Sequence, residues 1–183
     1  MMNTYVKSFV NTALILSICL HTINCMADNV FVNVTGSINV STCTVNNGNG
    51  IEIDFDNIPV SDIGNEKYNK YITVPVNCPF NTGVPYIKVL GDTLGADGNV
   101  LSTTTDNFGI ALFQGANLNK KLLLGNGAMS ADKFYGYRVG YGVEGYGTAD
   151  GTISFTAVPY KLGTSEPSAG RFTATATLSF NYL

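Results

Sequence analysis

The last fourteen residues of this 183-residue chain, residues 170–183, alternate between apolar and small polar side chains. The apolar set consists of Phe172, Ala174, Ala176, Leu178, Phe180 and Tyr182. A period of two is typical of a β-strand that buries one face. A strand with an open edge is a template for pairing with another chain. The C-terminus therefore predicts a β-strand that a second protein completes, which favours assembly over catalysis.

Short alternating segments also fill the rest of the chain, and Gly, Asn, Asp and Pro separate them. No segment has a convincing helical period. Several short strands at this spacing predict one all-β sandwich domain. The expected strands cover residues 30–45, 51–55, 71–78, 85–90, 108–114, 137–143, 152–160 and 171–182.

Residues 1–27 have the pattern of a secretory signal peptide, with Lys7 before an apolar run and Cys25-Met26-Ala27 before an expected cleavage at Asp28. The apolar run is too short to span a bilayer comfortably, so no transmembrane segment is expected after cleavage. Removing 27 of the 183 residues leaves 156, and the net charge changes from −3 to −4 because Lys7 is removed. This acidic balance disfavours a surface that binds nucleic acid or anionic membranes.

The cysteines agree with export. Cys19 and Cys25 would leave with the signal peptide, so Cys43 and Cys78 remain as an even pair. Exported proteins keep disulfides in their oxidising surroundings. The sequence therefore predicts one disulfide between Cys43 and Cys78.

A second alternation lies just before Cys43, and a glycine interrupts its otherwise apolar face. This face consists of Val30, Val32, Val34, Gly36, Ile38 and Val40. A glycine inside a strand often marks a bulge, a tight bend or the close approach of another surface. Taken alone, Gly36 is explained either by an irregularity of its own strand, such as a bulge or bend, or by the close approach of another surface.

Taken together, these features resemble the subunits of chaperone–usher pili over essentially the whole mature chain. The matching features are Gly170 fourteenth from the C-terminus, the penultimate Tyr182, the pair Cys43 and Cys78, and the extension that contains Gly36. Residues 43–48, 108–115 and 155–160 are most similar to the minor tip pilin that acts as an adaptor beneath the adhesin of P pili.

The resemblance implies an incomplete immunoglobulin-like β-sandwich that lacks its last strand and is completed by a strand from a chaperone or a neighbouring subunit. It divides the chain into a signal peptide (1–27), an N-terminal donor-strand extension (28–41) and a pilin domain (42–183). Val30, Val32, Val34, Ile38 and Val40 would enter a neighbour's groove, with Gly36 over a shallow pocket. The groove and chaperone-binding strand of this chain would comprise Gly170, Phe172, Ala174, Ala176, Leu178, Phe180, Tyr182 and Leu183.

The same resemblance implies partners and a location. The partners would be a periplasmic pilus chaperone, an outer-membrane usher and neighbouring pilus subunits, including a tip adhesin. The chain would pass through the periplasm to a fimbrium on the cell surface. Because the expected donor and groove are different surfaces of one molecule, their contact would build an open chain of subunits. An internal position, as an adaptor or as a major rod pilin, follows from this expectation.

The residue types disfavour an enzyme and predict no cofactor or metal site. The one histidine, His21, lies in the expected signal peptide, so the mature chain has no imidazole for acid–base catalysis or metal binding. Glu52, Asp54 and Asp56 alternate on one segment and are better explained as solvent-facing positions than as a carboxylate cluster.

Two further alternatives remain at this point. One is an exposed platform of Tyr135, Tyr137, Tyr141 and Tyr146 for stacking on carbohydrate, against half-buried tyrosines in a glycine-rich segment. The other is a self-complete secreted sandwich in which residues 28–41 pair with the chain's own last strand. The short connection to Cys43 argues against the second alternative, because it should hold the extension near the first strand of the domain.

Overall fold

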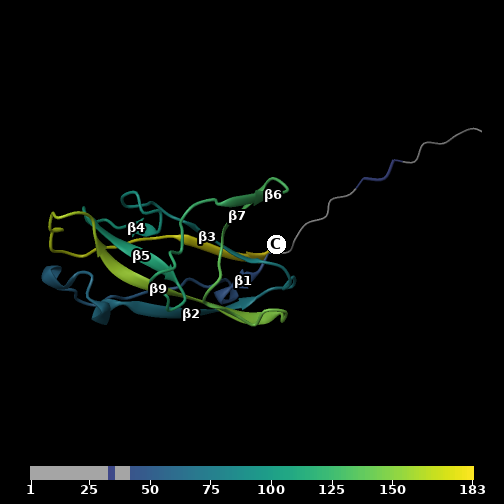
Figure 1. Ribbon diagram of the computed structural model, residues 1–183, viewed down its shortest axis with the longest axis horizontal. Coiled ribbons are helices and arrows are strands. Elements are labelled where there is room, and N and C mark those ends of the chain that lie inside the picture. Colours follow the sequence, from purple (N-terminus) through teal and green to yellow (C-terminus); the bar gives the residue numbers. More distant parts are fainter. Residues whose placement is uncertain (1–32, 36–41) are drawn as a thin grey trace, which may run out of the picture. The chain divides into compact units, whose positions relative to one another are not determined.

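The structure is a computed structural model that describes residues 33–35 and 42–183 (Figure 1). The predicted signal peptide, residues 1–27, lies outside the described residues. So do most of the residues expected to form the donor strand, namely Val30, Val32, Gly36, Ile38 and Val40. Val34 is described, and 87% of its surface is exposed.

Two antiparallel sheets make up the domain formed by residues 42–183. The first sheet has the order β1 (Thr44–Val45), β2 (Lys70–Asn77), β9 (Asp150–Lys161), β5 (Phe108–Gln114) and β4 (Val100–Ser102), and β8 (Val143–Glu144) also pairs with β9. The second sheet has the order β10 (Thr177–Tyr182), β3 (Pro85–Leu90), β7 (Lys133–Arg138) and β6 (Ala128–Ser130). Short 3₁₀ turns lie at η1 (Asn46–Gly48), η2 (Val60–Asp62) and η3 (Glu66–Tyr68).

The core lies between the inner faces of the two sheets. In the first sheet Val74 of β2 pairs with Ile153 of β9, and in the second sheet Ile87 of β3 pairs with Phe180 of β10. All four side chains are almost completely buried. Since each sheet contributes alternate residues to one apolar layer, the predicted all-β sandwich is confirmed.

Four of the predicted strands agree closely with the structure, whereas the predicted strand at residues 30–45 is present only as β1 in the described part of the chain, and two very short strands were missed. The predicted ranges 85–90 and 108–114 coincide with β3 and β5, and β2 and β9 differ from their predicted ranges by one or two residues at each end. The strands β4 and β6 have three residues each and were not predicted. Three residues are too few to establish a period of two.

The predicted strand at residues 51–55 is not present. Burial alternates there as expected, and Phe55 is buried, but the segment pairs with no strand in the described part of the chain. The Asp54 carboxylate accepts a 2.8 Å hydrogen bond from the backbone N–H of Asp56, whose φ is +53°. This local turn bends the chain away from an extended path.

The predicted strand at residues 137–143 is also wrong in its extent. It is replaced by the end of β7, at Arg138, and by β8, which begins at Val143. Gly142 between them has a φ of +73°, and a Cβ added there would lie only 2.7 Å from the backbone nitrogen of Gly115. A left-handed glycine packed against a neighbouring backbone interrupts the strand.

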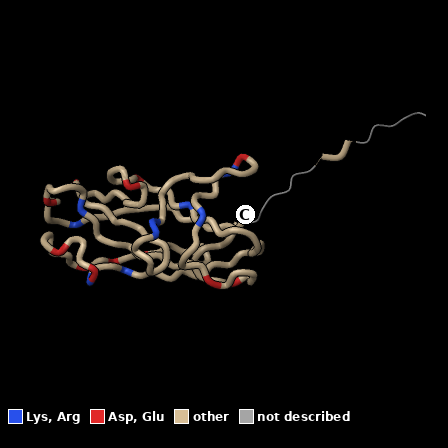
Figure 2. The backbone as a smooth tube through the Cα atoms, in the orientation of Figure 1, with Lys and Arg blue, Asp and Glu red and all other residues tan. Residues whose placement is uncertain are grey.

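Charges are interspersed over the described domain, as Figure 2 shows. Within the described residues, four lysines form ion pairs with Asp or Glu side chains, and all the side chains of these pairs are partly exposed. Among these residues no helix has the length and apolar character needed to cross a membrane.

Candidate functional site

The C-terminal strand β10 lies at the edge of its sheet. It pairs with β3 in continuous antiparallel register, from Thr177 opposite Leu90 to Tyr182 opposite Pro85. On its other edge, no strand of the described residues pairs with it (Figure 1). The backbone groups of an edge strand are available to a further strand.

The predicted apolar face of this strand points into the sandwich at its C-terminal end. Phe180 is completely buried and Tyr182 is almost so, and their rings meet edge to face with centroids 5.2 Å apart. Leu178 and Ala174 are half-buried, and Ala176 is exposed. The apolar face is therefore fully buried only at the C-terminal end of β10, and it is half-buried or exposed from Leu178 back to Phe172.

The C-terminal strand is shorter than the prediction of 171–182. It begins at Thr177, because its partner β3 ends at Leu90. Residues before Thr177 leave the sheet, and the backbone of Thr173 instead exchanges hydrogen bonds of 2.9 and 3.0 Å with Thr104. Residues 171–175 keep the alternating burial of a strand without a ladder partner in the described chain, and the alternation is interrupted at Ala176, which is exposed.

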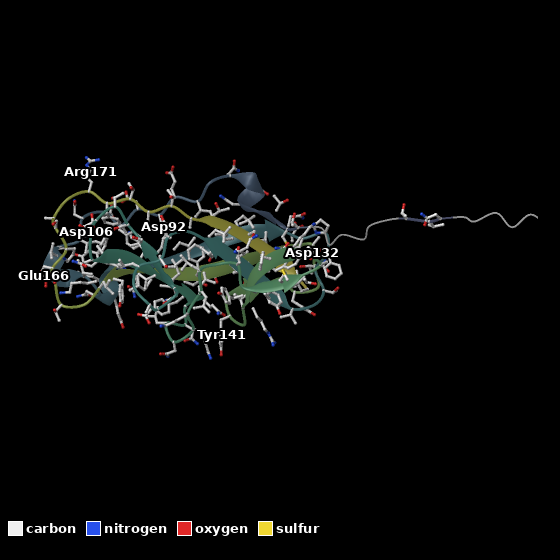
Figure 3. All side chains as sticks on the ribbon, turned by 90° about the horizontal axis from the view of Figure 1, so that it is seen from above. Asp92, Asp106, Asp132, Tyr141, Glu166 and Arg171 are labelled. Carbon is white, nitrogen blue, oxygen red and sulfur yellow. A yellow bond between two sulfur atoms is a disulfide. The ribbon has the colours of Figure 1, made fainter. Side chains whose placement is uncertain are left out.

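A pocket of about 570 Å³ lies at the beginning of this C-terminal segment. We call it the Phe172 pocket. Residues 167–172 form one wall, with Gly170 and Phe172 among them, and residues 56–60 form another. The Phe172 ring packs against Phe108 at 4.7 Å and Phe55 at 6.2 Å between ring centroids. Arg171 projects outward at this end of the domain, where Asp106 and Glu166 also lie (Figure 3).

The sequence did not predict the wall of the Phe172 pocket that residues 56–60 and Ile63 form. Ile58 and Ile63 pack against the core from this irregular segment, and both line the Phe172 pocket. Their apolar character was a visible signal. The segment has no strand period that would assign these two side chains to a face of a sheet. Its position beside Phe172 depends on contacts with residues far along the chain.

The C-terminal residue itself is held by the loop before β3. The backbone N–H of Leu183 donates to the carbonyl of Val84 at 2.9 Å, and the N–H of Val84 donates to the Leu183 terminal oxygen at 2.6 Å. Gly83 has a φ of +111°, and a Cβ built there would collide with that terminal oxygen. The loop at Gly83 and Val84 therefore fixes the position of the terminal carboxylate.

Tyr146 makes two further contacts at the C-terminal end of β10. Its ring meets Tyr182 edge to face at 5.8 Å between centroids, and its hydroxyl accepts a 3.3 Å hydrogen bond from the N–H of Gly83. Burial raises the pKa of the Tyr182 hydroxyl above its usual value, and repulsion from the ionised form of the nearby Tyr146 raises it further. Tyr182 is therefore neutral at physiological pH, and no charge opposes its packing in the core.

Gly83→Ala is expected to lower the free energy of unfolding by about 2 kcal/mol, since it combines a strained φ with a backbone collision. Urea denaturation monitored by circular dichroism measures the loss. Gly147→Ala is the matched control, because Gly147 has a φ of +80° with nothing within 4 Å of an added Cβ. The control should lose only the left-handed strain, about 1 kcal/mol. Equal losses in the two variants would contradict a specific contact with Leu183.

The predicted disulfide is confirmed. Cys43 and Cys78 are bonded, 35 residues apart in sequence. Cys43 directly precedes β1, and Cys78 directly follows β2, which pairs with β1. The bond therefore ties down the first strand of the domain, at the point where residues 28–41 join it.

The structure does not support a platform of four tyrosines. Tyr135 is 6% exposed and Tyr137 is half-buried, so neither offers a ring face to solvent. Tyr141 and Tyr146 are exposed, but Tyr146 belongs to the contact with Tyr182. The interpretation as a single exposed platform is wrong, because Tyr135 and Tyr137 lie on the inward side of β7.

The acidic residues form no metal centre in the part of the chain that the structure describes, where no group of three His, Cys, Asp or Glu side chains is placed to hold an ion. Asp54 caps a turn, and Asp56 lies 3.4 Å from the Lys70 amine. The candidate site of the C-terminal segment consists of the edge of β10 and the Phe172 pocket.

Known proteins with similar sequences are pilus components. A model of the family described as "Fimbrial protein" matches residues 32–183. The chain is 37% identical to the fimbrial adapter PapF of Escherichia coli over 94% of this chain and 99% of that protein. It is 36% identical to the minor fimbrial protein PrsF of Escherichia coli, again over 94% of this chain and 99% of the relative.

A solved structure of the P pilus adaptor subunit PapF matches with a TM-score of 0.55 and 32% identity, and covers 80% of this chain and 100% of that chain. The P pilus rod subunit PapA matches with a TM-score of 0.52 at 16% identity, over 84% of this chain and 100% of that chain, which shows a shared fold alone. The family match covers the whole described domain and the two relatives cover almost the whole sequence, so this chain belongs to the fimbrial protein family.

Proposed function

We propose that the chain is a minor tip pilin that acts as an adaptor and links a tip adhesin to the rest of a chaperone–usher fimbria. The observation that carries the proposal is the edge of β10 that no strand of the described residues pairs with, together with the apolar side chains of Phe172, Ala174, Ala176 and Leu178, which are only half-buried or exposed along it. A strand added along this edge would gain backbone hydrogen bonds and cover the half-buried apolar side chains.

The chain is a structural subunit and not an enzyme, as its family indicates. An adaptor is favoured over a rod pilin by the two relatives that share more than a third of its residues, which are named as an adapter and as a minor fimbrial protein. The likeness to the rod subunit rests on 16% identity and carries no argument about position in the fibre.

A periplasmic chaperone would occupy the edge of β10 first. The terminal carboxylate of Leu183 would then meet basic side chains of the chaperone, because charge-assisted hydrogen bonds to a carboxylate are strong and directional. One oxygen of this group already accepts from Val84, which orients the other. At an outer-membrane usher, the extension of the next subunit would replace the chaperone strand, and the assembled fibre would stand on the cell surface.

Residues 28–41 of this chain would be the corresponding donor to a neighbour. Val30, Val32 and Val34 would fill one part of the neighbour's groove, and Ile38 and Val40 another. Gly36 would lie over a shallow pocket between them. Cys43 follows directly, and its disulfide to Cys78 would hold the root of this donor strand against the domain.

Capture by the chaperone tests the proposal. The full sequence is co-expressed with a pilus chaperone in the periplasm, and the complex is purified through a tag on the chaperone. A chain truncated by Tyr182 and Leu183 should be captured about tenfold less or worse, since it loses a charge-assisted contact worth about 1.5–3 kcal/mol.

The truncation also removes a buried side chain, so a second variant is needed. Two residues, Gly-Ser, are added after Leu183, which keeps Tyr182 in the core and moves the carboxylate away from Val84. Weaker capture of both variants is expected. Capture equal to that of the unmodified chain in the extended variant would remove the proposed role of the carboxylate, and no capture of the unmodified chain would overturn the chaperone–usher assignment.

A further inference from the structure

A second pocket, of about 600 Å³, lies on the outer side of the first sheet. We call it the Tyr71 pocket. Its lining comes from β2, from the loop after β5 at residues 115–119, and from residues 141–144. Figure 3 shows Tyr141 on the side of the domain opposite Arg171, which borders the Phe172 pocket. The Tyr71 pocket is therefore separate from the pocket at the start of the C-terminal segment.

The ring of Tyr71 lies across the outer face of the sheet. Tyr71 pairs with Thr156 in the β2–β9 ladder, yet its hydroxyl donates a 2.9 Å hydrogen bond to the hydroxyl of Ser154, which lies two residues before Thr156 in β9. This hydrogen bond favours the orientation in which the ring lies along the sheet. Because 57% of Tyr71 is nevertheless exposed, the ring offers an apolar surface to solvent.

A second exposed tyrosine borders the same pocket. Tyr141 is 47% exposed, and the amine of Lys120 lies 5.7 Å from its ring centroid. The lysine attracts one part of the ring by a cation–π interaction and restrains it. Two restrained rings from segments 70 residues apart thus border one pocket.

The floor of the pocket is rigid backbone. The N–H of Gly115 donates to the carbonyl of Ser154 at 2.9 Å, and the N–H of Ser154 donates to the carbonyl of Gly142 at 2.6 Å. An added Cβ at Gly142 would collide with the carbonyl oxygen of Ser154, so only glycine permits this close approach. A preformed floor lowers the entropic cost of holding a ligand.

The rim carries hydrogen-bonding groups and little charge. Asn117 and Asn119 contribute amide side chains, and Glu144 is the one charged side chain among the residues that line the pocket. Amide and carboxylate groups pair with hydroxyl groups, and exposed tyrosine rings pack against apolar C–H surfaces. The Glu144 carboxylate and the Lys120 amine beside Tyr141 carry opposite charges, so the surroundings of the pocket favour neither an anionic nor a cationic ligand.

From this arrangement we propose that the Tyr71 pocket binds a neutral saccharide. The C–H face of a sugar ring would lie on Tyr71 or Tyr141, and its hydroxyl groups would hydrogen-bond to Asn117, Asn119 and Glu144. Saccharides combine an apolar face with a ring of hydroxyls, which is the combination that this pocket offers. The proposal does not depend on the adaptor function, because none of these residues belongs to β10 or to the Phe172 pocket.

The test uses the full sequence, exported to the periplasm and purified from it. Binding is measured on a printed panel of neutral and sialylated oligosaccharides, and by saturation-transfer NMR with the methyl glycosides of galactose, glucose, mannose and N-acetylglucosamine. Binding to at least one neutral sugar is expected. Tyr71→Ala and Tyr141→Ala should each weaken it about tenfold, the loss typical of truncating a central tyrosine.

Phe134→Ala is the matched control, because Phe134 is an exposed aromatic residue outside the pocket. It should leave the affinity unchanged. Tyr71→Phe keeps the ring and removes its hydrogen bond to Ser154, so it should give an intermediate affinity. Circular dichroism verifies that each variant is folded. Failure of every neutral sugar to bind, exclusive binding of sialylated sugars, or equal binding by Tyr71→Ala and Tyr141→Ala would overturn the proposal.

Discussion

A strand supplied along the open edge of β10 is expected to raise the midpoint of thermal unfolding of residues 42–183 by about 10 °C. A ligand present at 1,000 times its Kd stabilises the folded state by about 4 kcal/mol, and each kcal/mol raises the midpoint by about 2–4 °C in a domain of this size. The edge is suited to this gain because Ala176 is exposed and Phe172, Ala174 and Leu178 are only half-buried there.

Differential scanning calorimetry of residues 42–183, with the disulfide formed, measures the shift. The ligands are a pilus chaperone and a set of synthetic extension peptides, including residues 28–41. A subunit beneath an adhesin need not accept its own extension, so the set is more informative than the self peptide. In the control peptides, the valines at alternate positions are replaced by aspartate, which should abolish the shift because charges cannot enter the apolar groove.

A stable domain whose midpoint no strand changes would contradict this prediction. That result would show that residues 42–183 form a complete sandwich that needs no further strand along β10. A shift produced by the chaperone and by one or more peptides, and absent with the aspartate controls, would establish completion by a second chain.

Replacing both cysteines, Cys43→Ser with Cys78→Ser, is expected to lower the free energy of unfolding by about 4 kcal/mol. The estimate comes from the chain entropy that a loop with a sequence separation of 35 residues loses when it is closed. A loss of this size is a large share of the stability of a small domain. Urea denaturation of both proteins measures it, with a separate slope for each because the unfolded chain without the disulfide exposes more surface.

The unmodified protein treated with a reductant is the control for this double substitution. Reduction should cause nearly the same loss, because it opens the same loop without changing the side chains that pack around Cys78. The buried position of Cys78 adds a small packing cost to the double variant alone. A loss below about 1 kcal/mol in both proteins would show that the disulfide contributes little to the stability of the domain.

Local patterns predicted the fold class because they are visible within a few residues. Alternation in residues 85–90 and 108–114 gave the bounds of β3 and β5, since these strands are long enough to show a period and are paired along their whole length. Residues 51–55 show the same alternation, and Phe55 is buried as expected. They form no strand, because a ladder also requires a partner at the right place.

In the C-terminal segment too, the local pattern predicted which side chains are buried, and the partner strand decided where the strand begins. The sequence predicted the buried side of Phe180 and Tyr182, which follows from a period of two. It did not predict the beginning of β10 at Thr177, which depends on where β3 ends. The Phe172 pocket was missed in part because Ile58 and Ile63 reach it from an irregular segment more than a hundred residues earlier.

By itself, the sequence determined that this chain folds as an antiparallel sandwich with an apolar C-terminal strand and a Cys43–Cys78 disulfide, because alternation and cysteine number are properties of short segments and of composition. The tertiary structure alone decided that Gly83 and Val84 hold the terminal carboxylate and that Tyr71 and Tyr141 share a pocket. These contacts join segments many residues apart, and only the packing of the two sheets brings such segments together.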